Sequence, residues 1–277
     1  PIVSASVYAI QSDSQRQPSQ QESLVKYARL CAALLALTLA PAALAQPYRV
    51  VTEEWAPYNF QRNGEIVGIA TDIIRAIMTR TGDRFPLIML PSMRTSRELQ
   101  QRPHTIMFSM FRTAEREPLY KWVGPLLDEA IYPYQRADAK PVNSLEQLYA
   151  APRITTRHAG LVPTSLEGMG FSNLDKSAVG TQQLYQMLLA GRTDIIVGDT
   201  DIGVAHYSRQ FDIAPGTLRR IPIQLLHAPL YIAFSLDSED RVVDAWSAAL
   251  EQLRSDGELQ RIVDRYQPAA QAPAPTD

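Results

Sequence analysis

The fold class is indicated by residues 48–82, YRVVTEEWAPYNFQRNGEIVGIATDIIRAIMTRTG. Its first seven residues are rich in β-branched side chains, which is typical of a strand, and a turn follows at 63–64. Residues 71–82 place isoleucines and a methionine at helical spacing, which predicts a helix with one buried face. We expect Thr71 to cap this helix and Gly82 to end it. Strand, loop and helix in this order indicate an α/β protein.

The same alternation continues along the chain. Apolar runs at 85–90 and 105–110 predict two further strands of the same sheet. A change of composition at 137–145 indicates a link into a second unit. The elements expected there are a strand at 152–156, a helix at 182–191 and a strand at 193–199. Repeated β-α-β units predict mostly parallel sheets with crossover helices.

The N-terminal part predicts export from the cytoplasm. Lys26 and Arg29 precede the apolar run 30–45, which ends in Ala-Leu-Ala and is too short and too Ala-rich for a membrane span. We therefore expect a signal peptide at 24–45, cleaved after Ala45 on the way to the periplasm. The expected flanking segments are an upstream extension at 1–23 and a disordered Pro/Ala-rich tail at 268–277.

The composition excludes several classes of function. With 27 basic and 29 acidic residues the formal charge is −2, and no basic stripe indicates nucleic acid. The chain has one cysteine and four histidines that are scattered along the sequence, which is not the spacing of a Cys/His zinc site. We therefore expect no metal and no cofactor. No G-x-S-x-G elbow occurs, and we assign no catalytic residue.

The segment SMFRTAERE, 109–117, places charged residues directly after an apolar strand. Thr113 can cap a helix there, and the free N–H groups of a helix start attract anions. Arg116, in the first turn of that helix, could hold a carboxylate in two parallel hydrogen bonds. The alternative interpretation is a surface turn with scattered ion pairs.

Other candidate residues also follow predicted strands, where ligands of open parallel sheets bind. Glu54, Trp55 and Tyr58 come after the first strand, and the two aromatic side chains could form a wall of the site or cover an edge of the sheet. Asp199, after the strand 193–199, could neutralise an ammonium group or cap the next helix. Arg94 follows the second strand and faces either the site or the solvent.

From about residue 48 to 266 the chain resembles the bacterial extracellular, periplasmic solute-binding proteins of the polar amino acid ABC-transporter type. The landmarks that carry the resemblance are the opening stretch, FSMFRTAEREPLYKWVGPL, LLAGRTDIIVGD, LYIAFSLDSE and LRSDGELQRIVDRY. The resemblance implies a type II periplasmic-binding-protein fold, with two α/β lobes and a ligand cleft between them. It implies one lobe from 47–133 plus 226–267 and another from 137–222.

The resemblance also implies roles for individual residues. Arg116 would grip the α-carboxylate of an amino acid, Ser109 and Thr113 would add donors, and Trp55 would pack on the ligand, while Asp199 would take the α-amino group. Phe111 stands where many members have Ser or Thr, and Gly160-Leu161 replaces a Gly-Ser/Thr pair, so these positions should change the ligand.

The function expected from this resemblance is capture of an amino acid or derivative by a monomeric protein, which delivers it to an ABC permease in the inner membrane. Two alternatives stay open. One is a dehydratase acting on a prephenate-like acid, with Glu53, Glu54 or Asp199 as the general acid. The other is a ligand sensor that docks on a membrane receptor without transport.

Overall fold

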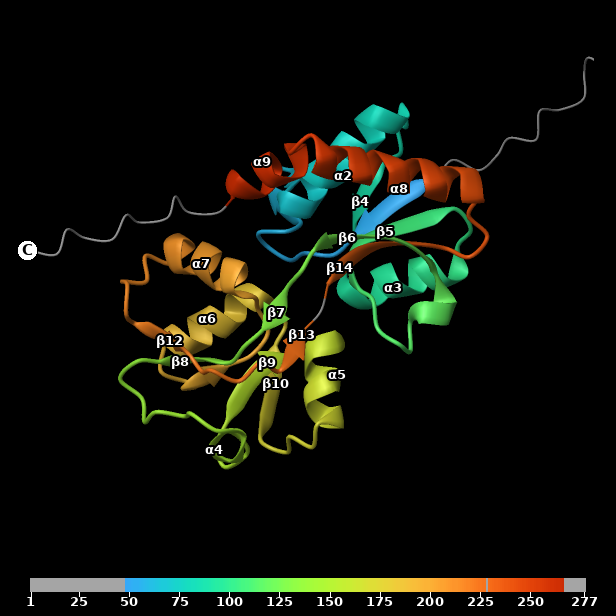
Figure 1. Ribbon diagram of the computed structural model, residues 1–277. Helices are drawn as coiled ribbons and strands as arrows, with labels where there is room; N and C mark the ends of the chain where they lie inside the picture. The colour runs from blue at the N-terminus through green and yellow to red at the C-terminus, as the bar shows by residue number, and fades with distance from the viewer. Residues whose placement is uncertain (1–47, 228, 267–277) are drawn as a thin grey trace, which may run out of the picture. The chain divides into compact units, whose positions relative to one another are not determined.

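Two five-stranded sheets organise the computed structural model, which describes residues 48–227 and 229–266 (Figure 1). The first sheet has the order β4-β1-β5-β14-β6, with β14 antiparallel to both neighbours and the other four strands running the same way. Its strands are β1 (Arg49–Thr52), β4 (Leu87–Met89), β5 (Thr105–Phe111), β6 (Lys121–Leu127) and β14 (Leu230–Phe234). The expected extension, signal peptide and C-terminal tail lie outside the described residues.

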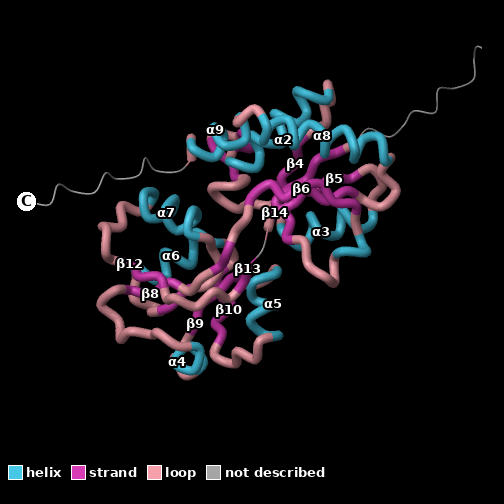
Figure 2. Tube along the Cα trace, viewed as in Figure 1, coloured by secondary structure: helices cyan, strands magenta, loops and turns pink. Residues whose placement is uncertain are grey.

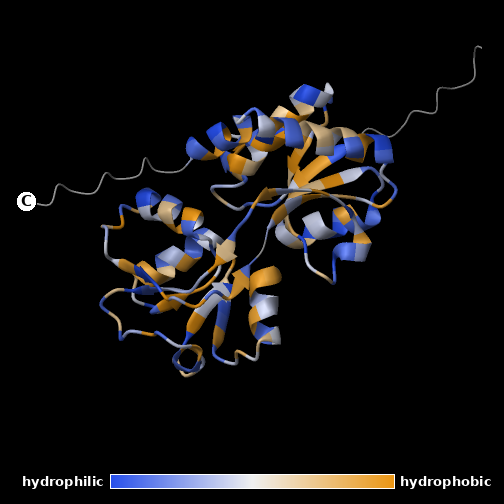
Figure 3. Ribbon diagram, in the orientation of Figure 1, coloured by the Kyte–Doolittle hydropathy of each residue, from blue (hydrophilic) through white to orange (hydrophobic). Residues whose placement is uncertain are grey.

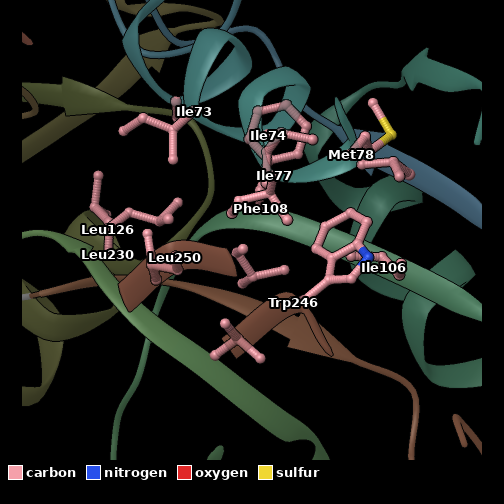
Figure 4. Packing of buried hydrophobic residues seen from close by; sticks show 14 of the residues in the cluster. Ile73, Ile74, Ile77, Met78, Ile106, Phe108, Leu126, Leu230, Trp246 and Leu250 are labelled. Carbon is pink, nitrogen blue, oxygen red and sulfur yellow. The ribbon is translucent and has the colours of Figure 1, made fainter. Parts of the chain in front are cut away.

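Helices cover both faces of the first sheet (Figure 1). Helices α2 (Ile69–Thr81), α8 (Asp240–Ser255) and α9 (Glu258–Asp264) lie on one face, and α3 (Ser92–Gln101) lies on the other. Strand β1 shows why both faces need a cover, since Val50 packs in the cluster of α2 and α8 while Val51 packs with Leu99 of α3. Trp246 is fully buried between α8 and the sheet, among isoleucines of α2 (Figure 4).

The second sheet has the order β10-β9-β11-β8-β12, and here β8 is the strand antiparallel to its neighbours. Its strands are β8 (Tyr134–Arg136), β9 (Ile154–Arg157), β10 (Leu174–Ala178), β11 (Ile195–Ile196) and β12 (Leu218–Arg220). Its helices are α4 (Leu145–Tyr149), α5 (Leu161–Gly168), α6 (Thr181–Leu189) and α7 (Asp201–Gln210). In both sheets the apolar residues concentrate on the strands and on the helix faces that cover them (Figure 3).

Two segments carry the chain from one sheet to the other (Figure 2). Strand β7 (Ala130–Ile131) leads from β6 to β8, and β13 (Leu226–His227) leads back from β12 to β14. The two pair antiparallel, with Leu226 opposite Ile131. A separate hairpin of β2 (Phe60–Arg62) and β3 (Glu65–Val67) precedes α2. Among the described residues no helix is both long and apolar enough to cross a membrane.

Helix α2 begins earlier than the sequence predicts. It starts at Ile69 after Gly68, and Thr71 is a buried residue of its first turn rather than its cap. The amides of Ile69 and Ala70 donate to the carbonyl oxygens of Pro57 and Tyr58, so backbone groups of the preceding loop satisfy the helix start. The expected end is confirmed, because Gly82 adopts the left-handed conformation with φ 78°.

No α-helix starts at Thr113, so that prediction is wrong. The amides of Arg116 and Glu117 both donate to the carbonyl of Thr113, and the only regular element is the 3₁₀ turn η1 (Glu117–Leu119). Tyr120 is already extended and β6 begins at Lys121, which leaves too little chain for a longer helix. An anion site based on a helix start is therefore absent from this segment.

Candidate functional site

Near the carboxyl end of β5 the backbone adopts a left-handed conformation, which buried hydrogen bonds stabilise. Ser109 has φ 59°, in the left-handed region, where the pairing of β5 with β14 shifts register. Its hydroxyl donates to Asn59 Oδ1, and Asn59 Nδ2 donates to the carbonyl of Glu53 at 2.5 Å. Both side chains are buried. Strand β5 and the loop after β1 are thus locked together beside the site.

Arg116 follows this strand and has no ion pair among the described residues. Its Nη1 donates to the carbonyl of Phe111 at 3.3 Å, which turns the side chain back toward the strand end. No carboxylate of the described residues forms an ion pair with it within 4.0 Å. Burial lowers the pKa of Arg116, an effect that Tyr120, Glu53 and Glu115 oppose from farther away. The guanidinium is therefore partly desolvated and open to an anion.

A cavity of about 560 Å³ lies against Arg116. This volume falls in the range of small-molecule sites. The lining residues that come from the first sheet and its neighbouring elements are Glu53, Ser92, Met93, Ser96, Met107, Ser109, Met110, Phe111, Thr113, Glu115 and Arg116. The second sheet and helix α5 contribute Arg157, Gly160, Leu161, Thr164 and Ser165. Polar and charged groups thus line one space from both five-stranded sheets and the elements beside them.

Arg157 is the charged residue that the second sheet brings to the cavity. It is the last residue of β9, it is 8% exposed, and its Nε has no hydrogen-bond partner among the described residues. Its Nη2 lies beside Gly160, 3.6 Å from where a Cβ on that glycine would be. Gly160 has φ 114° and precedes α5, whose start has no side-chain cap.

Asp199, Trp55 and Tyr58 form a buried group that does not line the cavity. Asp199 Oδ2 accepts from the Tyr185 hydroxyl at 3.0 Å, and Oδ1 accepts from the amide of Thr200 at 2.9 Å. Burial raises the pKa of Asp199 to about 7, against the lowering effect of these two donors. Trp55 is 2% exposed and also lowers this pKa, although its Nε1 makes no hydrogen bond of good geometry.

The alternative role of Asp199 as a helix cap is wrong. Thr200 is the N-cap of α7, and its hydroxyl accepts from the amide of Gly203 at 3.1 Å. The carboxylate of Asp199 instead contacts Gly203, where any larger residue would collide with it. Trp55 packs against Tyr58 and Phe111 in tilted arrangements, with ring centroids 4.6 and 5.5 Å away. Phe111 itself lines the cavity, so it connects this buried group to the cavity wall.

Glu54 and Arg94 also lie outside the cavity lining. Glu54 is exposed and accepts from the amide of Gln61 at 3.2 Å, on the side of the loop that faces His206. Arg94 extends from α3 into solvent, with Nε 3.7 Å from Glu98 Oε1. Of the nine residues expected from the sequence, the structure brings together at the cavity Ser109, Phe111, Thr113 and Arg116.

Two residues of the cavity lining, Arg157 and Glu53, are not among the binding residues expected from the sequence. Arg157 comes directly after the predicted strand 152–156 and is the last residue of the observed β9, so the rule that selected Asp199 would also select it. Glu53 was considered as a general acid and was not assigned to binding, yet it lines the cavity while Glu54 points elsewhere. Adjacent residues of an extended segment face opposite sides, which separates the two glutamates. No cluster of His, Cys, Asp and Glu suited to a metal occurs in the part of the chain that the structure describes.

Comparison with known families gives one match across most of the chain. The sequence model described as "Bacterial extracellular solute-binding proteins, family 3" matches residues 48–269. No curated protein matches significantly in sequence.

Solved structures with the same fold come from proteins of different activity. The substrate-binding protein of an amino acid ABC transporter has a TM-score of 0.66 and 19% identity, covering 79% of this chain and 98% of its own. A histidine kinase sensor domain similar to periplasmic binding proteins has a TM-score of 0.69 and 18% identity, covering 79% and 95%. The ancestral amino acid-binding protein AncCDT-1, a precursor of cyclohexadienyl dehydratase, has a TM-score of 0.66 and 17% identity, covering 79% and 94%. These likenesses confirm the two-lobed α/β fold, and fold alone leaves the activity open.

Proposed function

The chain belongs to the bacterial extracellular solute-binding proteins of family 3. We propose that it captures a small polar solute with a carboxylate group, which is an amino acid or a close derivative. The observation that carries the proposal is the guanidinium of Arg116, which is partly buried at the cavity without an ion pair among the described residues. A carboxylate there would receive charge-assisted hydrogen bonds in a partly desolvated place.

We propose that Ser109 and Thr113 add polar contacts beside Arg116, since both line the same wall. Two carboxylates can neutralise an α-ammonium group. Glu53 lines the cavity, whereas Asp199 becomes available only if Trp55 and its neighbours move, because Asp199 is 4% exposed. Comparing Glu53→Gln with Asp199→Asn in ligand titrations distinguishes the two roles.

We propose that the lobes are 47–133 plus 226–267 and 137–222, and that they close on the solute by bending at the paired strands β7 and β13. A ligand that contacts both lobes favours the closed state, because only that state makes both sets of contacts. The closed form of this monomer would then deliver the solute to an ABC permease in the inner membrane. The expected place of action is the periplasm, after removal of the signal peptide.

A thermal-shift screen of amino acids and small carboxylates tests the proposal. A ligand at 100 times its Kd should stabilise the protein by about 2.7 kcal/mol, and Arg116→Ala should abolish that shift. The matched control is Arg94→Ala, which removes an exposed guanidinium outside the cavity and should leave the shift unchanged. Binding that survives in Arg116→Ala would reject the carboxylate role of Arg116.

We propose binding without turnover. Incubation with prephenate or arogenate and chromatography of the products tests this, and product formation that Glu53→Gln abolishes would establish an enzyme instead. Uptake of the labelled solute by cells with and without the gene separates transport from sensing. A sensor would leave uptake unchanged when the gene is deleted.

A further inference from the structure

The proposed function gives Arg157 no task, yet this residue is the most deeply buried charge in the cavity lining. Arg157 is 8% exposed, whereas Glu53 and Arg116 are half-buried and Glu115 is exposed. A buried guanidinium without a counter-ion is costly, and natural proteins pair such charges. No residue of the described chain makes an ion pair with Arg157 within 4.0 Å.

Asp199 is the acidic group whose electrostatic attraction to Arg157 could give Arg157 a structural role. The two attract each other, because Arg157 lowers the pKa of Asp199, but this is the weakest of the influences on that carboxyl group. The oxygens of Asp199 already accept from Tyr185 and Thr200. No hydrogen bond or ion pair joins Arg157 to Asp199 among the described residues, and the Nε of Arg157 has no partner there.

The start of α5 adds a second attraction for negative charge at the same place. Arg157 Nη2 lies beside Gly160, and α5 begins at the next residue with no side-chain cap on its free amides. Pro163 has no N–H, so the amides at the helix start are those of Leu161 and Val162. Thr164 and Ser165 of the same helix also line the cavity.

We propose that Arg157 and the start of α5 bind a second acidic group of the ligand, so that the protein selects dicarboxylic amino acids. This inference rests on the proposed function and narrows its ligand class. With one carboxylate on Arg116, the other on Arg157 and the ammonium group beside Glu53, each ligand charge meets an opposite charge of the lining. A neutral or basic amino acid would leave Arg157 buried and unpaired, which disfavours its binding.

Isothermal titration of acid and amide pairs tests the proposal. The probes are L-glutamate against L-glutamine and L-aspartate against L-asparagine, with glutarate and succinate as dicarboxylates that lack the amine. The variants are Arg157→Gln, Arg157→Lys and, as matched control, Arg153→Gln. Arg153 lies just before β9, is exposed, and donates to the carbonyl of Arg192 at 3.1 Å, outside the cavity.

We expect the wild-type protein and Arg153→Gln to prefer one acid over its amide by roughly 10- to 100-fold, the range of one charged hydrogen-bonded contact. Arg157→Gln should reduce that preference to about threefold or less while the affinity for the amide stays the same, and Arg157→Lys should keep part of it. A purely structural Arg157 would weaken acid and amide alike, and this result would overturn the proposal even if Arg157→Gln is less stable.

Failure of this inference differs from failure of the proposed function. Tight binding of a neutral or basic amino acid, with weaker binding of the acids, rejects the second acidic group and leaves carboxylate capture intact. Binding of glutarate or succinate alone, lost in Arg157→Gln, supports the second acidic site and removes amino acids from the proposed function. Binding of no probe and of no compound in the thermal-shift screen rejects both.

Discussion

Tyr58 Oη and Thr200 Oγ1 lie 2.6 Å apart although 142 residues separate them in the chain. Tyr58 belongs to the loop after β1 of the first sheet, and Thr200 caps α7 beside the second sheet. Both side chains are fully buried, and Thr200 also bridges to Ile131 of the crossing strand β7. One hydrogen bond thus links the two halves of the chain close to the place where the chain passes between them.

Replacing Tyr58 by Phe removes this hydroxyl and keeps the ring. If the bond forms only when the lobes are closed, its loss should weaken ligand affinity about fivefold, since one buried hydrogen bond contributes about 1 kcal/mol. Titration calorimetry measures the change. Tyr149→Phe is the matched control, because the hydroxyl of Tyr149 donates to the carbonyl of Met169 and both residues belong to the half of the chain built on the second sheet. Equal affinities of wild type and Tyr58→Phe would show that the bond is indifferent to closure.

The stability of the protein should depend on the protonation of Asp199. Its folded-state pKa is raised to about 7, so between pH 4 and 7 the folded protein holds a proton that the unfolded chain has released. The free energy of unfolding should therefore fall as the pH rises through this window, by at most about 1.4 kcal/mol per pH unit for this group.

The variant Asp199→Asn isolates this contribution, because an amide has no proton to lose in this range. Urea unfolding at pH 4.5, 5.5, 6.5 and 7.5 should show a flatter dependence on pH than in the wild type. Asp194→Asn is the control, since Asp194 is exposed and lies directly before β11, in the same segment of the chain. A slope identical to that of the wild type would mean that Asp199 stays ionised in the folded protein.

Phe111 should determine which solutes fit the cavity. It is 6% exposed and packs on Trp55, so Phe111→Ser should reduce the free energy of unfolding by about 3 kcal/mol and enlarge the cavity. We expect the affinity for bulky amino acids, relative to that for small ones, to be higher in the variant than in the wild type. Phe85→Ser, which loses packing on Trp246 away from the cavity, should be destabilised with the order of ligands unchanged. An unchanged order in Phe111→Ser as well would remove Phe111 from selection.

Gly68 should be hard to replace because it holds the loop of Trp55 and Tyr58 against α2. It has φ 129°, and a Cβ there would lie 2.6 Å from the carbonyl oxygen of Pro57 and would also collide with that of Tyr58. We expect Gly68→Ala to lower the free energy of unfolding by more than about 2 kcal/mol. Gly64→Ala has a similar positive φ but open space around it, and should cost about 1 kcal/mol. Equal losses in urea unfolding would contradict this role.

The fold was predictable because its signals are local. The isoleucines of α2 repeat at helical spacing, and Gly82 ends the helix where its left-handed conformation is needed. The start of α2 was not predictable, since the groups that satisfy it are carbonyls of Pro57 and Tyr58 rather than a side chain of recognisable type.

The lining of the candidate site was predictable only where its residues come from one strand end. Ser109, Phe111, Thr113 and Arg116 come from a single segment and reach the cavity together. Asp199 ends the expected strand 193–199, whereas the observed β11 covers only Ile195–Ile196, and packing of Trp55 and Tyr185 encloses Asp199, which no local pattern shows. The burial of Arg157 and its unpartnered Nε depend on tertiary packing, which the sequence around 157 does not show.

Titration calorimetry on Arg116→Gln, with the tightest amino acid ligand of the wild-type protein, tests the central claim most directly. Gln keeps a polar side chain and removes the charge that would pair with the carboxylate. We expect the Kd to rise at least about 100-fold, the effect of losing a charged, partly buried and bidentate contact. The melting temperature of the ligand-free variant should stay within a few degrees of the wild type. A Kd within about twofold of the wild-type value would contradict carboxylate capture by Arg116.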